Sequence, residues 1–484
     1  MRKEPVVADR DLDAAIAVTR FGLGAKPGEI ARARSDPRGF LTAQIRPSGA
    51  DQPRTNGETS AQRIAGFRVY QQDKRGMKRA ASEDEPAPDA RDPVKIAQKM
   101  LRDDVATDFL ARAQLGAATE AGFCERWTLF WANHFTVSAN KLVTATVVGP
   151  FENEAIRPHV FGRFADLLST ATTHPAMLLY LDQAQSIGPG SPAAQFLSRP
   201  RRGAGAGAPS AGRKSAGLNE NLAREILELH TVGVDGGYSQ ADVTEFARAM
   251  TGLSVGGFRE DPEMLGRPVF RAVAHEPGAR MVMGVRYAPG GKEQVEAILT
   301  DLARHPATAR FICTKIARHF VADDPPPALV RRLEYAWAES SGELDHVARV
   351  LIGAPESWAP QPAKFKTPYE FMISSWRAAG AAPRDIGRLA PVLNAMGQKA
   401  FSAPSPKGWP EETAAWATPA ALVQRMSWAQ AFSEAVVRDR DPKALAAEAL
   451  GARLSAATAT AIARAESRAE GFALLLMSPE FQRR

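Results

Sequence analysis

Apolar residues recur every three or four positions along most of this chain, and that spacing places them on one face of a helix. Two short helices are expected within residues 10–47, where glycines and a proline in FGLGAKPGE mark the turn between them. Helical spacing continues over residues 93–181, 219–252 and 294–353 and through most of the remaining sequence. The pattern predicts a mainly α protein, built as a multi-helix globular array.

Residues 268–288 depart from this pattern, because apolar and polar residues alternate there as they do in a half-buried strand. The runs VFRAVAH and ARMVMGVRY flank Glu276, Pro277 and Gly278, which form a typical turn sequence. We therefore expect one small β-hairpin with its turn at these three residues.

Two segments interrupt what we expect to be a single large helical domain over residues 1–484. Residues 48–93 are polar and of mixed charge, and they predict an irregular excursion with a helix near residues 60–78. Residues 186–217 are rich in glycine, alanine and proline, which cannot bury a core, so they predict a flexible basic loop inserted into the domain.

Most of the net charge belongs to that loop. The chain has 61 Lys and Arg against 54 Asp and Glu, a net charge of +7. Five of these positive charges, and no negative ones, lie between residues 196 and 217, at Arg199, Arg201, Arg202, Arg213 and Lys214. Because the rest of the chain is nearly neutral, nucleic-acid binding is disfavoured as the main function.

Several common classes of protein find no support in the sequence. No apolar run approaches the roughly 18 residues that span a bilayer. The first residues lack the pattern of a signal peptide, so a cytoplasmic location is expected. Two cysteines, Cys124 and Cys313, are too few for a disulfide framework or a thiolate zinc site. Phosphate loops, nucleophile elbows, H-E-x-x-H helices and dinucleotide fingerprints are also missing.

His134 is the first candidate for chemistry. Trp127, Phe130, Trp131 and His134 share one helical face in ERWTLFWANHF, so the imidazole closes an aromatic stripe. Such a residue can be a core histidine with one satisfied hydrogen bond. It can also be a metal ligand or a general base in an apolar pocket.

His159 is the second candidate. Pro158 suits the first position of a new helix, which would place His159 in the first turn. The helix dipole disfavours positive charge there and would keep the imidazole neutral, ready to accept a proton or bind a metal. Glu152 and Glu154 are its possible companions, or else carboxylates that complement a helix start.

The densest polar motif is GLNENLAREILELH. On a straight α-helix Asn221, Arg224, Glu225 and Glu228 fall within one arc of about 100°, bordered by apolar residues on both sides. The two carboxylates could hold a divalent cation, with Asn221 and Arg224 assisting its binding. They could equally belong to a buried Glu–Arg network or to a solvated face.

His230 falls on the opposite side of the same predicted helix, so it cannot share a metal with that stripe. It lies in the last turn before Gly233, where the dipole favours a protonated histidine cap. After it, Ser239 and Asp242 form a capping-box pattern for the next helix.

Taken together, these blocks resemble one family. FWANHFTVSANK, IRPHVFGRFADLLSTATTHPAMLLYLD, residues 218–231, VDGGYSQADVTEFARAMTGL, AHEPGARMVMG, HPATARFICTKIARHFVADDPP and PSPKGWP are similar to the bacterial family of unknown function numbered 1800. The resemblance runs from about residue 13 to the C-terminus. The sequence departs from it by lacking an export signal, by having Leu253 where Trp is common, and by the basic insertion before Asn219.

The resemblance implies a mainly helical fold and a genomic context rather than an activity. Genes of this family commonly neighbour a second family of unknown function, numbered 1501, which resembles the alkaline phosphatase and sulfatase superfamily and often carries a twin-arginine leader. Members of the 1800 family often carry export signals themselves. A periplasmic location reached through a partner's leader is therefore the alternative to a cytoplasmic one.

Two functional hypotheses follow. The first is a metal-assisted hydrolase or oxidoreductase, in which His134, His159, Glu225 and Glu228 act as ligands or acid–base groups and Asn221 and Arg224 help to hold the cofactor. The second is a non-catalytic scaffold or maturation partner of the co-encoded phosphatase-like protein. No catalytic residue is carried over from the family.

Overall fold

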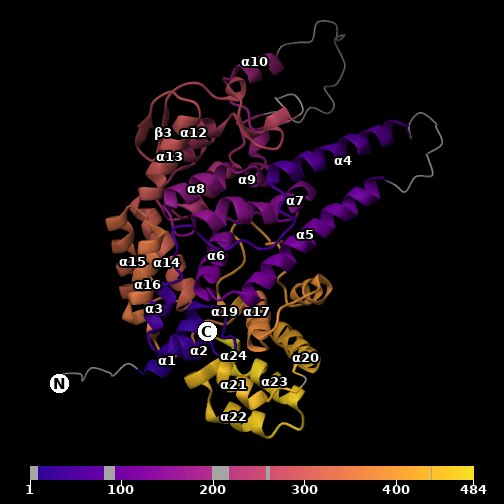
Figure 1. Ribbon diagram of the computed structural model, residues 1–484. Coiled ribbons are helices and arrows are strands. Elements are labelled where there is room, and N and C mark those ends of the chain that lie inside the picture. The colour runs from indigo at the N-terminus through magenta and orange to yellow at the C-terminus, as the bar shows by residue number, and fades with distance from the viewer. Residues whose placement is uncertain (1–8, 81–92, 199–216, 258–261, 438) are drawn as a thin grey trace, which may run out of the picture.

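The computed structural model describes residues 9–80, 93–198, 217–257, 262–437 and 439–484. Helices dominate it, with two small antiparallel pairs of strands, as the sequence pattern predicts (Figure 1). No helix in these ranges is long and apolar enough to cross a membrane. The core of the predicted basic loop, residues 199–216, lies outside the described residues.

The N-terminal part contains the longest helices. Its elements are α1 (Arg10–Ile16), η1 (Ala17–Phe21), α2 (Glu29–Ala33), α3 (Pro37–Thr42), α4 (Ser60–Ala80), α5 (Pro93–Ala118), α6 (Gly122–His134), α7 (Leu142–Phe151), η2 (Glu152–Ile156), η3 (Arg157–His159), α8 (Phe164–Thr173), α9 (Pro175–Tyr180), η4 (Gln183–Gln185) and α10 (Pro192–Ser198). Helix α4 occupies the place where the sequence predicts a helix near residues 60–78. Together α4 and α5 project from the body of the molecule (Figure 1).

The middle part adds helices and all the strands. Its helical elements are α11 (Asn221–Glu225), η5 (Ile226–His230), α12 (Gln240–Met250), η6 (Pro262–Met264), η7 (Ala272–Ala274), α13 (Lys292–Arg304), α14 (Pro306–Phe320), α15 (Pro327–Ser340), α16 (Leu344–Gly353) and η8 (Pro355–Trp358). The predicted capping box begins α12, where the Ser239 side chain accepts from the Asp242 N–H at 3.3 Å and the Asp242 side chain accepts from the Ser239 N–H at 2.7 Å.

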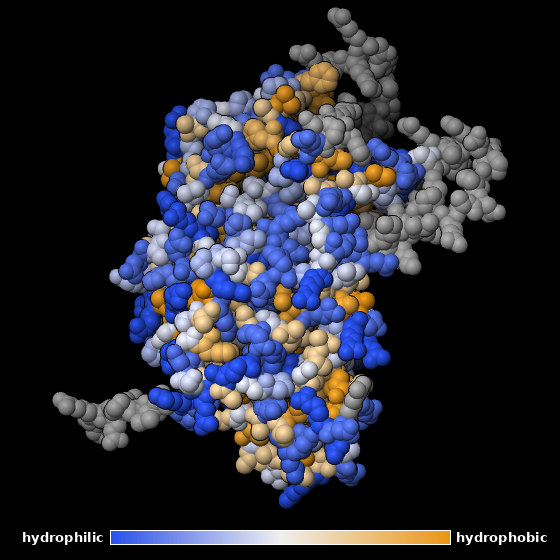
Figure 2. All heavy atoms as spheres, in the orientation of Figure 1, coloured by the Kyte–Doolittle hydropathy of each residue, from blue (hydrophilic) through white to orange (hydrophobic). Residues whose placement is uncertain are grey.

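The C-terminal part is mainly helical. Its elements are α17 (Pro368–Ala378), η9 (Ile386–Arg388), α18 (Ala390–Ala395), α19 (Thr413–Trp416), α20 (Pro419–Val436), α21 (Pro442–Leu450), η10 (Gly451–Arg453), α22 (Ala456–Ala463), α23 (Arg468–Met477) and α24 (Pro479–Gln482). Thr367 and Glu370 cap the start of α17 and fix Tyr369 and Glu370 at its first turn. Figure 2 shows that this part and the body present a mixed, mostly polar face to solvent.

The small β-hairpin is present, but its turn is not at Glu276–Gly278 as predicted. Strand β3 (Arg280–Val282) pairs with β4 (Val285–Tyr287) across Met283 and Gly284, which both have positive φ. Two consecutive residues with positive φ are what a tight two-residue hairpin requires. The earlier run belongs to β2 (Pro268–Phe270), which pairs instead with β1 (Leu253–Val255).

The main hydrophobic core forms around α6. Trp127, Phe130 and Trp131 are fully buried, as their shared helical face predicts. Trp127 donates to the Val160 carbonyl at 2.7 Å, and its ring packs 5.9 Å from Phe320 of α14. The aromatic stripe therefore joins α6 to the segment before α8 and to the end of α14.

A buried ion cluster fixes the polar segment that follows α7. Arg157 of η3 is fully buried, 2.8 Å from Glu125 of α6 and 2.7 Å from Glu152 of η2. Burial alone would lower the pKa of Arg157, but the two carboxylates outweigh it and raise that pKa. The guanidinium is thus held charged between three elements.

Substitution Glu125→Ala tests this cluster. It removes one of the two carboxylates that compensate Arg157, and we expect the free energy of unfolding to fall by about 3 kcal/mol in urea denaturation. Glu296→Ala is the matched control, because it removes the carboxylate of the exposed Lys292–Glu296 pair and should change stability by less than about 0.5 kcal/mol. An equal fall in the free energy of unfolding in Glu125→Ala and Glu296→Ala would contradict the conclusion that Arg157 needs Glu125 as a partner in the core.

Candidate active site

A cavity of about 110 Å³ lies where α5, α6, α14, α17 and the segment before α19 meet. Its wall is largely apolar, made by Phe109, Leu129, Phe151, Phe401 and Trp409. The polar part of the wall includes Arg126, Asn133, His319, Tyr369, Glu370 and Glu411, together with Arg112, Thr136, Glu152, Thr367, Gln398 and Lys399. A water needs about 10–15 Å³ on this measure, so the cavity holds several waters or a small molecule. An apolar pocket with a few convergent polar groups is the usual form of a ligand site.

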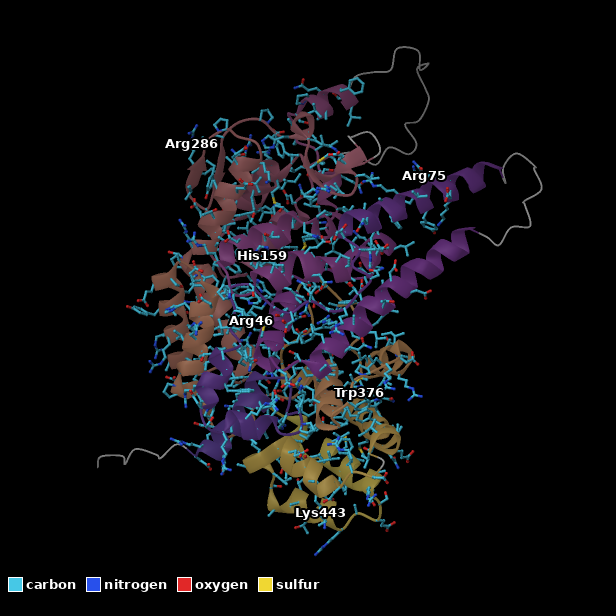
Figure 3. The ribbon with its side chains drawn as sticks, viewed as in Figure 1. Arg46, Arg75, His159, Arg286, Trp376 and Lys443 are labelled. Atoms are coloured by element: carbon cyan, nitrogen blue, oxygen red, sulfur yellow. The ribbon has the colours of Figure 1, made fainter. Side chains whose placement is uncertain are left out.

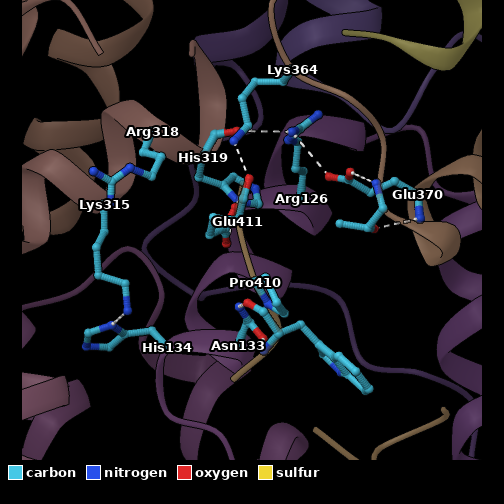
Figure 4. A network of polar contacts seen from close by, with 12 residues as sticks. Arg126, Asn133, His134, Lys315, Arg318, His319, Lys364, Glu370, Pro410 and Glu411 are labelled. Carbon is cyan, nitrogen blue, oxygen red and sulfur yellow. Dashed lines mark hydrogen bonds and ion pairs between the residues drawn. The ribbon is translucent and has the colours of Figure 1, made fainter. Parts of the chain in front are cut away.

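His319 and Glu411 form the central pair of this wall (Figure 4). The Nδ1 atom of His319 lies 2.9 Å from Glu411 Oε2 and 3.1 Å from Oε1. An ionised carboxylate only accepts, so Nδ1 carries the proton and donates it. The other nitrogen, Nε2, is buried and has no hydrogen-bond partner among the described residues. His319 is a residue of the cavity wall, so a small side-chain movement would present this nitrogen to a molecule in the cavity.

Glu411 is kept ionised by its surroundings. Burial alone would raise its pKa, but the interaction with His319 and the charges of Lys364 and Lys315 outweigh burial and lower the pKa to about 2. Lys364 also donates to the Glu411 main-chain carbonyl and lies 2.5 Å from Asp323. The carboxylate can thus orient His319 and stabilise its protonated form, as the third member of a nucleophile–base–orienter arrangement does.

The segment that carries Glu411 is fastened to the end of α6. The side chain of Asn133 accepts from the Trp409 N–H at 2.7 Å and donates to the Trp409 carbonyl at 3.0 Å. Gly408 has φ +85°, and a Cβ there would lie 2.4 Å from the Asn133 carbonyl oxygen. Glycine is required at this close approach, and it sets Glu411 opposite His319.

Arg126 and Tyr369 supply further polar groups to the cavity. Arg126 lies 3.3 Å from Glu370, whose other partner Arg484 is 3.0 Å away. The Nε atom of Arg126 and the hydroxyl of Tyr369 are buried without a hydrogen-bond partner in the described part of the chain. Buried donors without partners are uncommon, and here both belong to residues of the cavity wall.

His134 lies beside this wall rather than in it. Its Nε2 atom is 3.2 Å from the His230 carbonyl oxygen, and its Nδ1 atom is 2.9 Å from the amine of Lys315. Burial, followed by the charge of Lys315, lowers the pKa of His134 well below its usual value. The aromatic ring of Phe130 packs on both His134 and His319 and separates the two imidazoles.

His230 is not the protonated helix cap that a straight helix predicts. Residues Ile226–His230 form a π-helical turn, which breaks the α-helical spacing after Glu225 and brings the His230 ring 5.8 Å from that of His134. His230 is buried, and burial lowers its pKa to about 3. Neither ring nitrogen has a partner among the described residues.

His159 occupies a 3₁₀ turn instead of the first turn of a helix, since α8 begins only at Phe164 (Figure 3). Its pKa is lowered, as expected, but the cause is burial rather than a helix dipole. The proposed companions are engaged elsewhere: Glu152 pairs with Arg157, and Glu154 lies 2.9 Å from His174.

The polar stripe of α11 and η5 faces partly outward. Asn221 is exposed, and Arg224 lies 3.1 Å from Glu220 and 2.9 Å from Gln240. Tyr238 donates to Glu228 at 3.3 Å. Burial and the charge of Glu228 raise the pKa of Glu225. The guanidinium of Arg224 thus pairs with Glu220 and not with the two predicted ligands.

The four predicted metal ligands are not assembled into one site. Among the residues that the structure describes, no three His, Cys, Asp or Glu side chains are arranged to hold a metal ion. His134 lies beside Lys315, His159 on its 3₁₀ turn, and Glu225 with Glu228 beside Tyr238. What the structure brings together is a different set: His319, Glu411, Arg126 and Tyr369.

The fold and this cavity define a mainly helical protein with a histidine–carboxylate pair facing a small internal space. The chain belongs to the family described as protein of unknown function (DUF1800), whose model matches residues 16–483, so the resemblance noted in the sequence is confirmed. No curated protein and no solved structure matches the chain.

The neutral state of His230 predicts a dependence of stability on pH. Its folded pKa of about 3 is below the ordinary value of 6.5, so only the unfolded chain binds a proton there between these limits. The free energy of unfolding should fall as the pH is lowered through that range, by up to about 1.4 kcal/mol per pH unit for this residue. In His230→Leu, the free energy of unfolding measured by urea titration should change less steeply with pH, by that amount per pH unit.

His346 provides the control for this titration. Its side chain is 41% exposed, and His346→Leu shows how the loss of an exposed imidazole affects the same slope. A slope in His230→Leu equal to that of the unsubstituted protein would contradict a buried neutral His230.

Proposed function

We propose that this protein is a hydrolase that cleaves a small ester or amide in the cavity, with His319 as the general base. The observation that carries the proposal is His319 itself, a residue of the cavity wall whose Nδ1 is held by Glu411 and whose buried Nε2 has no hydrogen-bond partner among the described residues. A histidine in this state can take a proton from a bound water as the water attacks a carbonyl carbon.

The other polar groups of the cavity suit the later steps of such a reaction. Attack by water places negative charge on the carbonyl oxygen, and the Nε atom of Arg126 and the Tyr369 hydroxyl are donors without a partner among the described residues, on two residues of the same wall. Protonated His319 can then give its proton to the leaving group, while the charge of Glu411 stabilises the imidazolium. The apolar part of the wall limits bulk water around these groups.

This proposal keeps the hydrolase predicted from the sequence and changes the residues that perform it. The predicted metal-assisted form relied on His134, His159, Glu225 and Glu228, whereas hydrolysis by His319 needs only groups that already line the cavity.

The test is a panel of small chromogenic esters and anilides assayed with the unsubstituted protein and two variants. His319→Gln removes the base, and we expect kcat/KM to fall about 10²–10⁴-fold. Glu411→Gln keeps an oxygen that can accept the hydrogen bond from His319 Nδ1 but removes the negative charge. We expect kcat/KM to fall less than in His319→Gln. Retained folding is checked by thermal unfolding.

The matched control is His346→Gln. His346 also lies near a carboxylate, 3.8 Å from Glu339, but its side chain is exposed and outside the cavity wall. Its substitution should leave activity unchanged. Equal activity in His319→Gln and the unsubstituted protein would refute the proposal.

The predicted scaffold role, the partner from the family numbered 1501 and the periplasmic route through that partner's leader remain alternatives to the enzyme. Co-purification with the co-encoded protein separates them from hydrolysis. A stable complex formed equally by His319→Gln, without any turnover of the panel by the unsubstituted protein, would favour the scaffold.

A further inference from the structure

Lys315 is an unusual lysine in this protein. Its amine donates to His134 Nδ1 at 2.9 Å, and among the described residues no carboxylate lies within the 4.0 Å of an ion pair. Other lysines are paired in the ordinary way, as Lys141 is with Asp182 at 2.8 Å and Lys364 with Asp323 at 2.5 Å. Lys315 therefore carries an amine that, within the described part of the chain, has a neutral imidazole as its close polar partner.

The hydrogen bonds of His134 make that imidazole an acceptor for the amine. The His230 carbonyl can only accept, so Nε2 of His134 carries the proton and Nδ1 presents a lone pair to Lys315. This is the order of an activated nucleophile: an amine, a base within hydrogen-bond distance, and a third group that orients the base. His230 adds a buried ring with two unpartnered nitrogens beside the pair.

The charges around Lys315 come from three directions. Arg318 lies on its own helix, His134 and His230 pack from α6 and η5, and Lys407, Glu411 and Glu412 lie on the segment before α19. Burial is the largest influence and lowers the pKa of Lys315 to about 8; Lys407 and Arg318 also lower it, whereas Glu411 and Glu412 oppose the shift. The amine is thus partly unprotonated near neutral pH.

We propose that Lys315 is a nucleophilic lysine that forms an imine with a small aldehyde or ketone, with His134 as its base. Residue 315 as a whole is partly exposed while its amine is buried, and the Phe311 ring, 5.5 Å from the amine, is an apolar neighbour for a small carbonyl compound. The site lies outside the cavity of His319 and does not depend on the hydrolase.

The proposed step is a condensation. The free amine adds to the carbonyl carbon, His134 takes one proton from the nitrogen of the adduct and passes it to the carbonyl oxygen, and the second nitrogen proton follows, so that the oxygen leaves as water. A carbon–nitrogen double bond replaces the carbon–oxygen double bond, and no oxidant or reductant is needed.

The experiment traps the imine with limiting propanal and borohydride near neutral pH and locates the alkylated lysines by peptide mass spectrometry. A lysine of pKa about 8 has more than about 100-fold more free amine at pH 7 than one of ordinary pKa. We expect Lys315 to be alkylated at least about tenfold faster than Lys141, which is more exposed but paired.

Two further measurements decide the assignment. His134→Gln should slow the alkylation of Lys315 and leave the alkylation rate of Lys141 unchanged. If this variant does not fold, the rates at Lys315 and Lys141 in the unsubstituted protein decide the assignment. Lys366, which is buried and bonded to the Ser374 hydroxyl at 3.0 Å, should remain unlabelled. Labelling that follows exposure alone, with Lys315 no faster than Lys141, would overturn the proposal.

Discussion

Charge buried inside a helical core is the constraint on which the rest of this structure depends, because each buried ion must find its partners in the protein. Arg157 takes two carboxylates, Arg377 lies 2.8 Å from Glu29, and Glu370 serves both Arg126 and Arg484. These pairs join segments that are far apart in the chain. They also decide which polar groups are consumed by the fold and which are left over for chemistry.

The leftover groups cluster around one helix. Lys315 and His319 stand four residues apart on α14, so both point toward α6 and the segment before α19. Phe130 separates them into two environments: a carboxylate-bound histidine on the cavity, and a lysine bound to a neutral histidine. The charge of Glu411 acts on both residues, which links the two sites electrostatically.

Local periodicity was enough to predict the helical class, the buried stripe of α6 and the capping box of α12. It was not enough for the site, because the partners come from distant segments. His319 and Glu411 are separated by 92 positions, and no spacing rule connects them. The i, i+4 relation of Lys315 and His319 was the one local signal that could have singled them out. The π-helical turn Ile226–His230 also could not be predicted from α-helical spacing. It changes the direction in which the side chains of that segment point, so the predicted position of His230 was wrong.

The most direct test of the central claim is the reactivity of His319 toward diethyl pyrocarbonate, which acylates an unprotonated imidazole nitrogen. Peptide mass spectrometry would give the rate at each histidine in the unsubstituted protein. If Nε2 of His319 is open to the cavity, His319 should be modified more rapidly than His134, whose two nitrogens are both engaged, and than the buried His230. An unmodified His319 under conditions in which the exposed His346 reacts fully would contradict the account.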